Sequence, residues 1–181
     1  MFTINRQDNR IKPVKAKSFN ELGFSERKHL QEWLAHQPNA LGAEELLIIQ
    51  KEFAGFDETR ERLDLLALDK DGNLVIIENK LDDSGRDVVW QAVKYASYCA
   101  SLSKAQIVEI YQQYLEQYEP VAADADSPAT PTNAASRICD FLNAPDLDEV
   151  KLNLGNSQRL ILVAANFRKE VTSTALWLLG Q

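Results

Sequence analysis

Two apolar runs separated by a short polar segment form the clearest pattern in the chain. Residues 65–68 and 74–77 are apolar at consecutive positions, which is typical of central strands covered on both faces. The segment between them contains Lys70, Asp71 and Gly72, a composition that favours a tight turn. The pattern therefore predicts two buried strands joined as a hairpin.

Charged residues stand where these runs begin and end. Asp64 precedes the first run, and Glu78 and Lys80 follow the second. If 70–72 is a three-residue loop with a left-handed glycine, Asp64 lies directly opposite Glu78, and Lys80 shares their face. A two-residue turn would shift the register by one and separate the two acids. Whether the two acids and Lys80 lie on one face therefore depends on the length of the turn.

Two opposed carboxylates repel each other unless a cation lies between them. Oxygen ligands suit Mg²⁺ or Mn²⁺, and a lysine beside the metal can stabilise the charge that develops during phosphodiester hydrolysis. The alternative is an ordinary acid pair at the solvated end of a sheet, partly neutralised by Lys80. The spacing alone leaves both interpretations open, because short motifs recur by chance.

A helix is expected from a cap at Ser25 to about His36, with Pro38 and Gly42 beyond its end and an apolar stripe formed by Leu30, Trp33 and Leu34. At 100° per residue, Glu26 falls on this stripe, whereas Glu32 lies well off it. Glu26 is therefore a candidate site residue. The alternative is an acid in the first helical turn that is favoured by the helix dipole.

A second helix is expected over about 86–100. It places Gln91 and Tyr95 four positions apart, so that both side chains point the same way. Taken alone, two such residues at the edge of a core carry no functional meaning.

Taken together, Glu26, Asp64, Glu78-Asn79-Lys80 and the segment from Gln91 to Tyr95 resemble the PD-(D/E)XK nuclease superfamily. The resemblance is nearest to bacterial proteins related to the NucS-like endonucleases. It covers about residues 20–101, with weaker support near 158–167. The order and spacing of the motifs carry it, because each motif is degenerate by itself.

The resemblance implies an α/β fold with a restriction-endonuclease-like αβββαβ core, in which helices flank a mixed central sheet. It also implies Mg²⁺ or Mn²⁺ as cofactor and nucleic acid, most simply DNA, as partner. Leu63 stands where the family name has proline, a position that varies. The implied metal ligands are Asp64, Glu78 and the Asn79 carbonyl, and the implied catalytic group is Lys80, with Glu26 as the helix-one acid and Gln91 and Tyr95 as an accessory motif.

Four parts are expected along the chain. They are a basic leader at 1–19, the nuclease-like core at 20–103, a helical insertion at 104–157 and a final core strand with the start of a helix at 158–181. A flexible linker is expected at 119–135, because the segment is rich in Ala, Asp, Ser, Thr and Pro.

Within the last two parts, a helix over 104–118 carries a tyrosine-containing stripe typical of a core or an interface. A short helix is expected near 135–143, another buried strand of the sheet over 159–165 and a helix from 172. The apolar ending at 176–179 suggests a fragment or a face that packs on a partner. A homo-oligomer or larger assembly through either surface stays open.

Composition limits the alternatives. The chain has 181 residues, 45% of them hydrophobic, enough for one sizeable core. No stretch approaches the roughly 20 apolar residues of a membrane span, and no signal peptide is evident at the start. Cys99 and Cys139 lack paired spacing, so buried thiols in a reducing cytoplasm are expected rather than zinc or a disulfide.

The net charge of -7 argues against nonspecific coating of nucleic acid, but it is unevenly spread. Residues 1–30 contain seven basic and three acidic side chains, whereas 105–150 contain nine acids and one base. The first segment is either a solvated leader or part of a basic groove.

The resulting hypothesis is a metal-dependent nuclease that hydrolyses phosphodiester bonds. Two other classes stay open: a catalytically silent module of the same fold that binds nucleic acid or protein, and a structural subunit.

Overall fold

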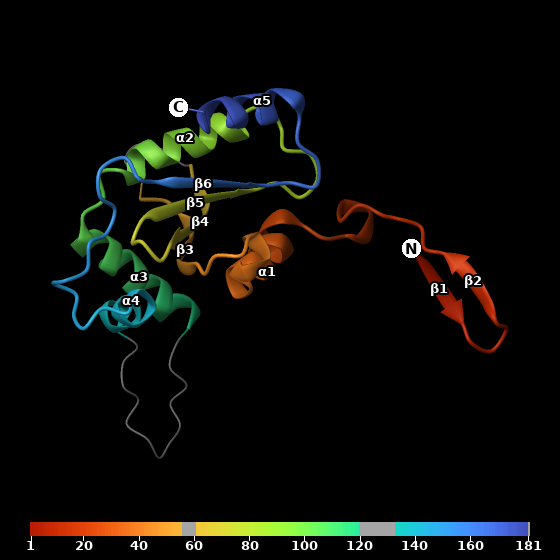
Figure 1. Ribbon diagram of the computed structural model, residues 1–181, viewed down its shortest axis with the longest axis horizontal. Helices are drawn as coiled ribbons and strands as arrows, with labels where there is room; N and C mark the ends of the chain where they lie inside the picture. Colours follow the sequence, from red (N-terminus) through yellow and green to blue (C-terminus); the bar gives the residue numbers. More distant parts are fainter. Residues whose placement is uncertain (56–60, 120–132, 181) are drawn as a thin grey trace, which may run out of the picture.

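The computed structural model describes residues 1–55, 61–119 and 133–180. Its centre is a four-stranded mixed sheet flanked by helices (Figure 1), so the chain is an α/β protein. In spatial order, the first strand is antiparallel to the second and the second is antiparallel to the third. The fourth strand is parallel to the third. In spatial order the strands are β3 (Leu47–Phe53), β4 (Leu63–Leu68), β5 (Leu74–Asn79) and β6 (Arg159–Val163).

The two predicted apolar runs form the middle of this sheet. Every residue of β4 and β5 is buried, including the charged residues at their ends. β4 begins at Leu63, and β5 continues to Asn79. The candidate acids therefore lie within the strands rather than beyond them.

The β4–β5 turn has the three-residue form. The Asp69 amide donates to the Asn73 carbonyl at 3.1 Å, and Gly72 has a φ of 80°, a left-handed conformation that glycine adopts without strain. Leu65 pairs with Ile77 and Leu68 with Leu74. The predicted register is confirmed.

This turn is held from outside by the segment that follows α4 (Ala134–Leu142), which also reaches the end of α2 (Val88–Cys99). A Cβ atom on Gly72 would lie 2.3 Å from the Lys151 carbonyl oxygen, so only glycine fits. The Asn153 amide donates to the Gly72 carbonyl at 2.9 Å. The Asn153 side chain in turn donates to the carbonyls of Cys99 and Leu102, both at 2.9 Å, where α2 ends. One asparagine thus joins the turn to the end of a helix.

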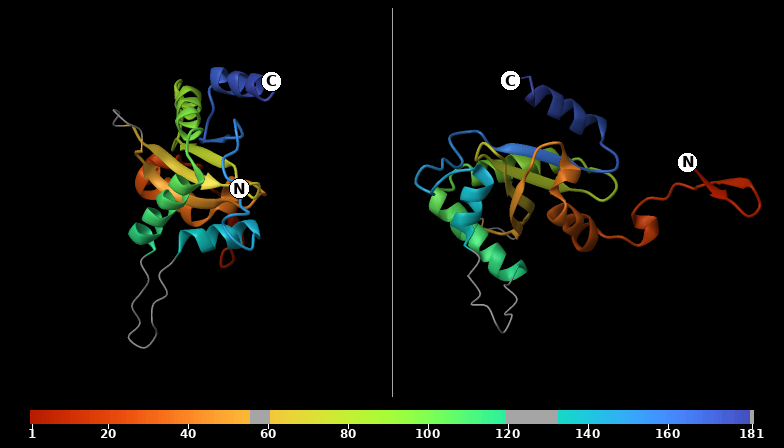
Figure 2. Two further views of the ribbon diagram at one scale, coloured as in Figure 1. Left: turned by 90° about the vertical axis from the view of Figure 1, so that its left-hand side faces the viewer. Right: turned by 60° about the horizontal axis from the view of Figure 1, so that its bottom comes forward.

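Helices cover both faces of the sheet (Figures 1 and 2). On one side lie α2 (Val88–Cys99), which contacts β5 and β6, and α5 (Lys169–Leu178). On the other lie α1 (Gln31–His36), α3 (Lys104–Tyr118) and α4 (Ala134–Leu142). The helices predicted at 86–100, 104–118 and 135–143 are present within two residues of their expected ends, and α5 begins three residues before its expected start. The buried strand predicted over 159–165 is β6, which ends at Val163 and is only partly buried because it lies at the edge of the sheet.

The first predicted helix is less regular than its sequence pattern. It begins with a π-helical turn, η2 (Glu26–Leu30), which leads into α1. Ser25 occupies the N-cap position but makes no capping hydrogen bond, and its hydroxyl lies 3.1 Å from Nδ1 of His29. Leu30 and Leu34 are buried as predicted, whereas Trp33 is 40% exposed. Two short 3-10 turns flank this region, η1 (Asn20–Leu22) and η3 (Pro38–Leu41).

The tyrosine stripe of α3 is part of the core. Tyr111 and Tyr114 are buried, and α3 packs against β3 and α4, so most of the stripe is covered within the chain. Cys99 and Cys139 are buried free thiols, as predicted. The linker expected at 119–135 lies mostly outside the described residues, and its last two positions, 134 and 135, begin α4.

The N-terminal leader contains an unpredicted hairpin. Strands β1 (Phe2–Asn5) and β2 (Arg10–Pro13) pair antiparallel, with Ile4 opposite Ile11. Nearly all of its residues are exposed, and it projects beyond the end of the sheet where β5 and β6 end (Figure 1). Among the described residues, no helix has both the length and the apolar character needed to cross a membrane.

Candidate metal and phosphodiester site

Asp64 and Glu78 lie on neighbouring strands at one end of the sheet. The β4–β5 register places them directly opposite each other, and they are only 7% and 2% exposed. One oxygen of Asp64, Oδ2, accepts a hydrogen bond of 2.8 Å from the Asn79 amide. The buried Oε1 of Glu78 has no hydrogen-bond partner within the described part of the chain. The pair therefore holds an unsatisfied acceptor in a poorly solvated place.

The electrostatics of the pair follow from this burial. Burial raises the pKa of Asp64 to about 6, although the Asn79 amide and the Lys80 ammonium lower it. Burial, followed by repulsion from Asp64, raises the pKa of Glu78 to about 8. Burial disfavours the charged form of each carboxylate, and the neighbouring anion disfavours it further, so both pKa values rise. A cation between the two would relieve both costs.

Lys80 and Glu26 complete the group. The Lys80 ammonium lies 3.7 Å from Oε1 of Glu26, and Oε2 of Glu26 accepts a 3.0 Å hydrogen bond from the Leu81 amide. Glu26 thus reaches the end of β5 from η2. Glu32 points elsewhere, because both its carboxylate oxygens accept hydrogen bonds from Lys51 at 2.8 and 2.9 Å. The expected distinction between the two acids is confirmed.

The two candidate residues of α2, Gln91 and Tyr95, differ in burial and in contacts. Tyr95 is buried, its hydroxyl donates to the Arg62 carbonyl at 3.2 Å, and burial together with Glu78 raises its pKa to about 12. Gln91 lies one turn earlier on α2 and is half-buried. Asn79 contributes its backbone amide, whereas its fully buried side chain has no hydrogen-bond partner among the described residues.

A further acid, Glu52, was not anticipated from sequence. The β3–β4 register places it opposite Asp64, so that Glu52, Asp64 and Glu78 cross three adjacent strands in a row. Glu52 also raises the pKa of Asp64 and lies 3.2 Å from Arg27. Its φ of 52° is unusual for a non-glycine residue and is typical of strained positions near functional sites. In the sequence, Glu52 follows Gln50 and Lys51 after the apolar run at 46–49, so nothing there marks it as a site residue.

The residues fit a divalent cation in part. In the described part of the chain, no three His, Cys, Asp or Glu side chains converge closely enough to hold a metal ion by themselves. Asp64 and Glu78 supply two carboxylates, and the unpartnered Oε1 of Glu78 is suited to coordination. The remaining ligands of Mg²⁺ would come from the backbone and water, which is usual because this ion keeps several waters.

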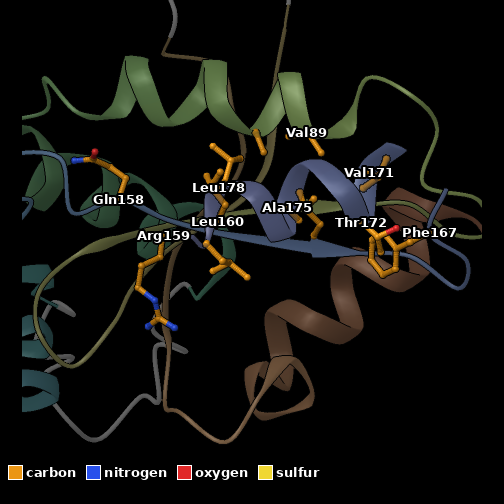
Figure 3. A pocket seen from close by; sticks show the side chains of 12 residues that line it. Val89, Gln158, Arg159, Leu160, Phe167, Val171, Thr172, Ala175 and Leu178 are labelled. Atoms are coloured by element: carbon orange, nitrogen blue, oxygen red, sulfur yellow. The ribbon is translucent and has the colours of Figure 1, made fainter. Parts of the chain in front are cut away.

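An apolar cavity lies away from these residues. It has a volume of about 610 Å³ and is bounded by α2, β6 and α5. Figure 3 shows Val89, Leu160 and Ala175 among its lining side chains. The cavity contains none of the candidate site residues, so its apolar lining reflects the loose packing of α5 rather than phosphodiester chemistry.

Comparisons of the chain with protein-family models, curated proteins and solved structures find no match.

Proposed function

We propose that the protein is a metal-dependent nuclease that hydrolyses phosphodiester bonds, most simply in DNA. The observation that carries the proposal is the direct opposition of Asp64 and Glu78, with Lys80 and Glu26 beside them. The succession of a helix, three antiparallel strands, α2 and, after the inserted helices α3 and α4, a parallel strand supports it, because the resembled superfamily has an αβββαβ core.

Each side chain has a role that follows from its position. Asp64 and Glu78 would hold Mg²⁺ or Mn²⁺, which lowers the pKa of bound water and stabilises charge on a phosphoryl oxygen. Lys80 brings a positive charge to the same end of β5, where it can stabilise the developing negative charge or orient a water molecule. Glu26 orients the Lys80 ammonium and holds the Leu81 amide. Tyr95 packs beside the acids and limits their access to water.

The test is incubation of the protein with supercoiled plasmid and with single-stranded DNA, in Mg²⁺, Mn²⁺ or EDTA. Cleavage should require the metal. Lys80→Ala should lower the rate roughly 10²-fold or more, because stabilisation of developing charge is commonly worth that much. Lys151→Ala, which removes an exposed lysine from the loop beside the β4–β5 turn, is the matched control and should cleave at the wild-type rate.

Metal titration by calorimetry separates the roles of the site residues. Lys80→Ala should keep most of the metal affinity, because the lysine is not a ligand. Asp64→Asn should lose affinity and cleavage together, because it removes a charged ligand.

The second candidate is a catalytically silent module of the same fold. It is favoured by the absence, within the described residues, of three convergent side-chain ligands. If the wild-type protein neither cleaves any nucleic acid nor binds a divalent ion by calorimetry, the nuclease proposal fails and the silent module takes its place.

A further inference from the structure

The N-terminal hairpin has two chemically different faces. Phe2, Ile4 and Ile11 share one face, because Ile4 and Ile11 pair directly and Phe2 lies two positions from Ile4. The opposite face contains Thr3, Asn5, Arg10 and Lys12. A two-stranded hairpin of this size buries little surface and contributes little to a core. Its sequence therefore needs an explanation outside the fold.

Charge distinguishes this arm, residues 1–17, from the rest of the protein. It carries five basic residues and one acid, Asp8, whereas the remaining chain carries 15 basic and 26 acidic residues. The basic residues of the arm are Arg6, Arg10, Lys12, Lys15 and Lys17, all of them exposed. None of the ion pairs found among the described residues involves these five side chains. So concentrated a positive charge on an acidic protein favours an anionic partner.

An aromatic cluster attaches the root of the arm to the helix that carries Glu26. The rings of Phe19 and Phe24 lie 5.7 and 5.0 Å from the ring of Trp33, both edge to face. This cluster explains why Trp33 is not in the main core. Because Glu26 reaches Lys80 from the same helix, the arm and the candidate site are joined through one short rigid element.

The arm also lies at the correct end of the sheet. It projects beyond the end at which β5 and β6 finish, and Glu78 and Lys80 lie at that end (Figures 1 and 2). Lys28, exposed on η2, adds a positive charge to the helical segment that carries Glu26. A polyanion that passes the site would therefore meet the arm next.

We propose that residues 1–17 form a basic arm that binds the phosphate backbone of a nucleic acid and holds it beside the Asp64–Glu78 pair. The binding face is the one that contains Arg10 and Lys12, and the paired apolar residues on the other face keep the hairpin closed. The arm contributes affinity rather than sequence recognition, because phosphate contacts carry no base information. The inference rests on the proposed nuclease function for the identity of the anion.

The experiment measures binding of fluorescently labelled single-stranded and duplex DNA to the full chain by anisotropy, in EDTA, over a series of salt concentrations. EDTA separates binding from cleavage. Lys12→Gln/Lys15→Gln is compared with Lys151→Gln/Lys169→Gln, which removes two exposed lysines outside the arm and changes the net charge equally. Circular dichroism and thermal unfolding confirm that both variants fold.

The arm variant should bind DNA about tenfold or more weakly near 0.1 M salt, and its slope of log affinity against log salt should fall by about one per lysine. The control should match the wild type. Equal effects of the two variants, or no binding of either DNA by the wild type, would overturn the inference. So would arm-dependent binding to vesicles that contain anionic lipid without binding to DNA, since that result assigns the amphipathic hairpin to a membrane surface.

These outcomes separate the inference from the nuclease proposal. DNA binding that depends on the arm, without metal-dependent cleavage, would support the arm and remove the nuclease. Metal-dependent cleavage with binding that is indifferent to the arm would do the reverse.

Discussion

Glu26 and Glu32 lie six positions apart in one helical segment but belong to different ion pairs. Glu26 lies beside Lys80, and Glu32 holds the buried Lys51. At the scale of single residues, one acid therefore belongs to the candidate site and the other to an ion pair of the fold.

Glu26→Gln should lower the rate of metal-dependent cleavage and leave the free energy of unfolding nearly unchanged, because Glu26 is partly exposed and its ion pair is long. Glu32→Gln should lower stability, because Lys51 then loses its anion while its ammonium stays buried. Cleavage per folded molecule and urea unfolding of both variants distinguish the two effects. A larger loss of cleavage in Glu32→Gln would contradict the assignment of Glu26 to the site.

The main site residues were predictable because their positions follow from two regular periods. Asp64 and Glu78 follow from strand register, and Glu26 follows from helical phase. Glu52 was not predictable. Its position opposite Asp64 depends on a register irregularity between Ile48 and Gln50, and its backbone leaves the ordinary strand conformation. Neither feature has a signature in a single sequence.

At the scale of elements, the β4–β5 turn depends on Asp69. Its Oδ1 accepts hydrogen bonds from the amides of Asp71 and Asn73, and its Oδ2 accepts from the Arg159 guanidinium. Burial raises the pKa of Asp69, but the hydrogen bonds from Asn73 and Arg159 outweigh it and hold the pKa below its ordinary value. The ionised form of Asp69 thus stabilises the turn.

Asp69→Ala should cost about 1–3 kcal/mol of unfolding free energy near neutral pH, because it leaves several partly buried donors unpaired at once. A carboxylate with a lowered pKa stabilises the fold fully above its unfolded pKa, and the stabilisation is lost as pH falls through the folded pKa. The difference from wild type should therefore shrink below about pH 4. Urea unfolding over a pH series measures it, with the exposed Asp71→Ala as control. A cost that does not change with pH would assign the effect to packing instead.

The regular elements of the core could be predicted from sequence better than the irregular ones. The apolar runs of β4 and β5 and the stripe of α3 predicted correctly which parts of these elements are buried. The N-terminal hairpin was not predicted, because its alternation of apolar and polar residues is short and neither of its faces is buried. The π-helical turn at Glu26–Leu30 was not predicted either, because its amino-acid composition does not distinguish it from an α-helix.

For the whole molecule, packing quality declines from the sheet outward. β4 and β5 are wholly buried, whereas α5 has a single buried residue, Val171, and borders the apolar cavity. The hairpin of the arm is almost entirely exposed. Local stability should follow this gradient.

Native-state hydrogen exchange should be slowest in β4 and β5, faster in α5 and fastest in the β1–β2 hairpin. Addition of DNA in EDTA should slow exchange in the hairpin more than in α5 if the arm binds it. Mass spectrometry of peptic peptides gives these rates. Exchange of α5 as slow as that of β4 would show that the helix is held more firmly than its contacts with α2 and β6 indicate.

Asn153 has a consequence for any attempt to shorten the protein. From its sequence, the segment 104–157 resembles an addition to the core. A truncated form of the protein would therefore be expected to omit it. Yet Asn153 holds the turn that aligns Asp64 with Glu78, where the Lys151 backbone carbonyl lies against Gly72, and Asn153 also satisfies carbonyls at the end of the helix that carries Tyr95. The part of this segment around Asn153 thus stabilises the β4–β5 hairpin from outside, and the smallest unit that keeps the candidate site aligned includes it.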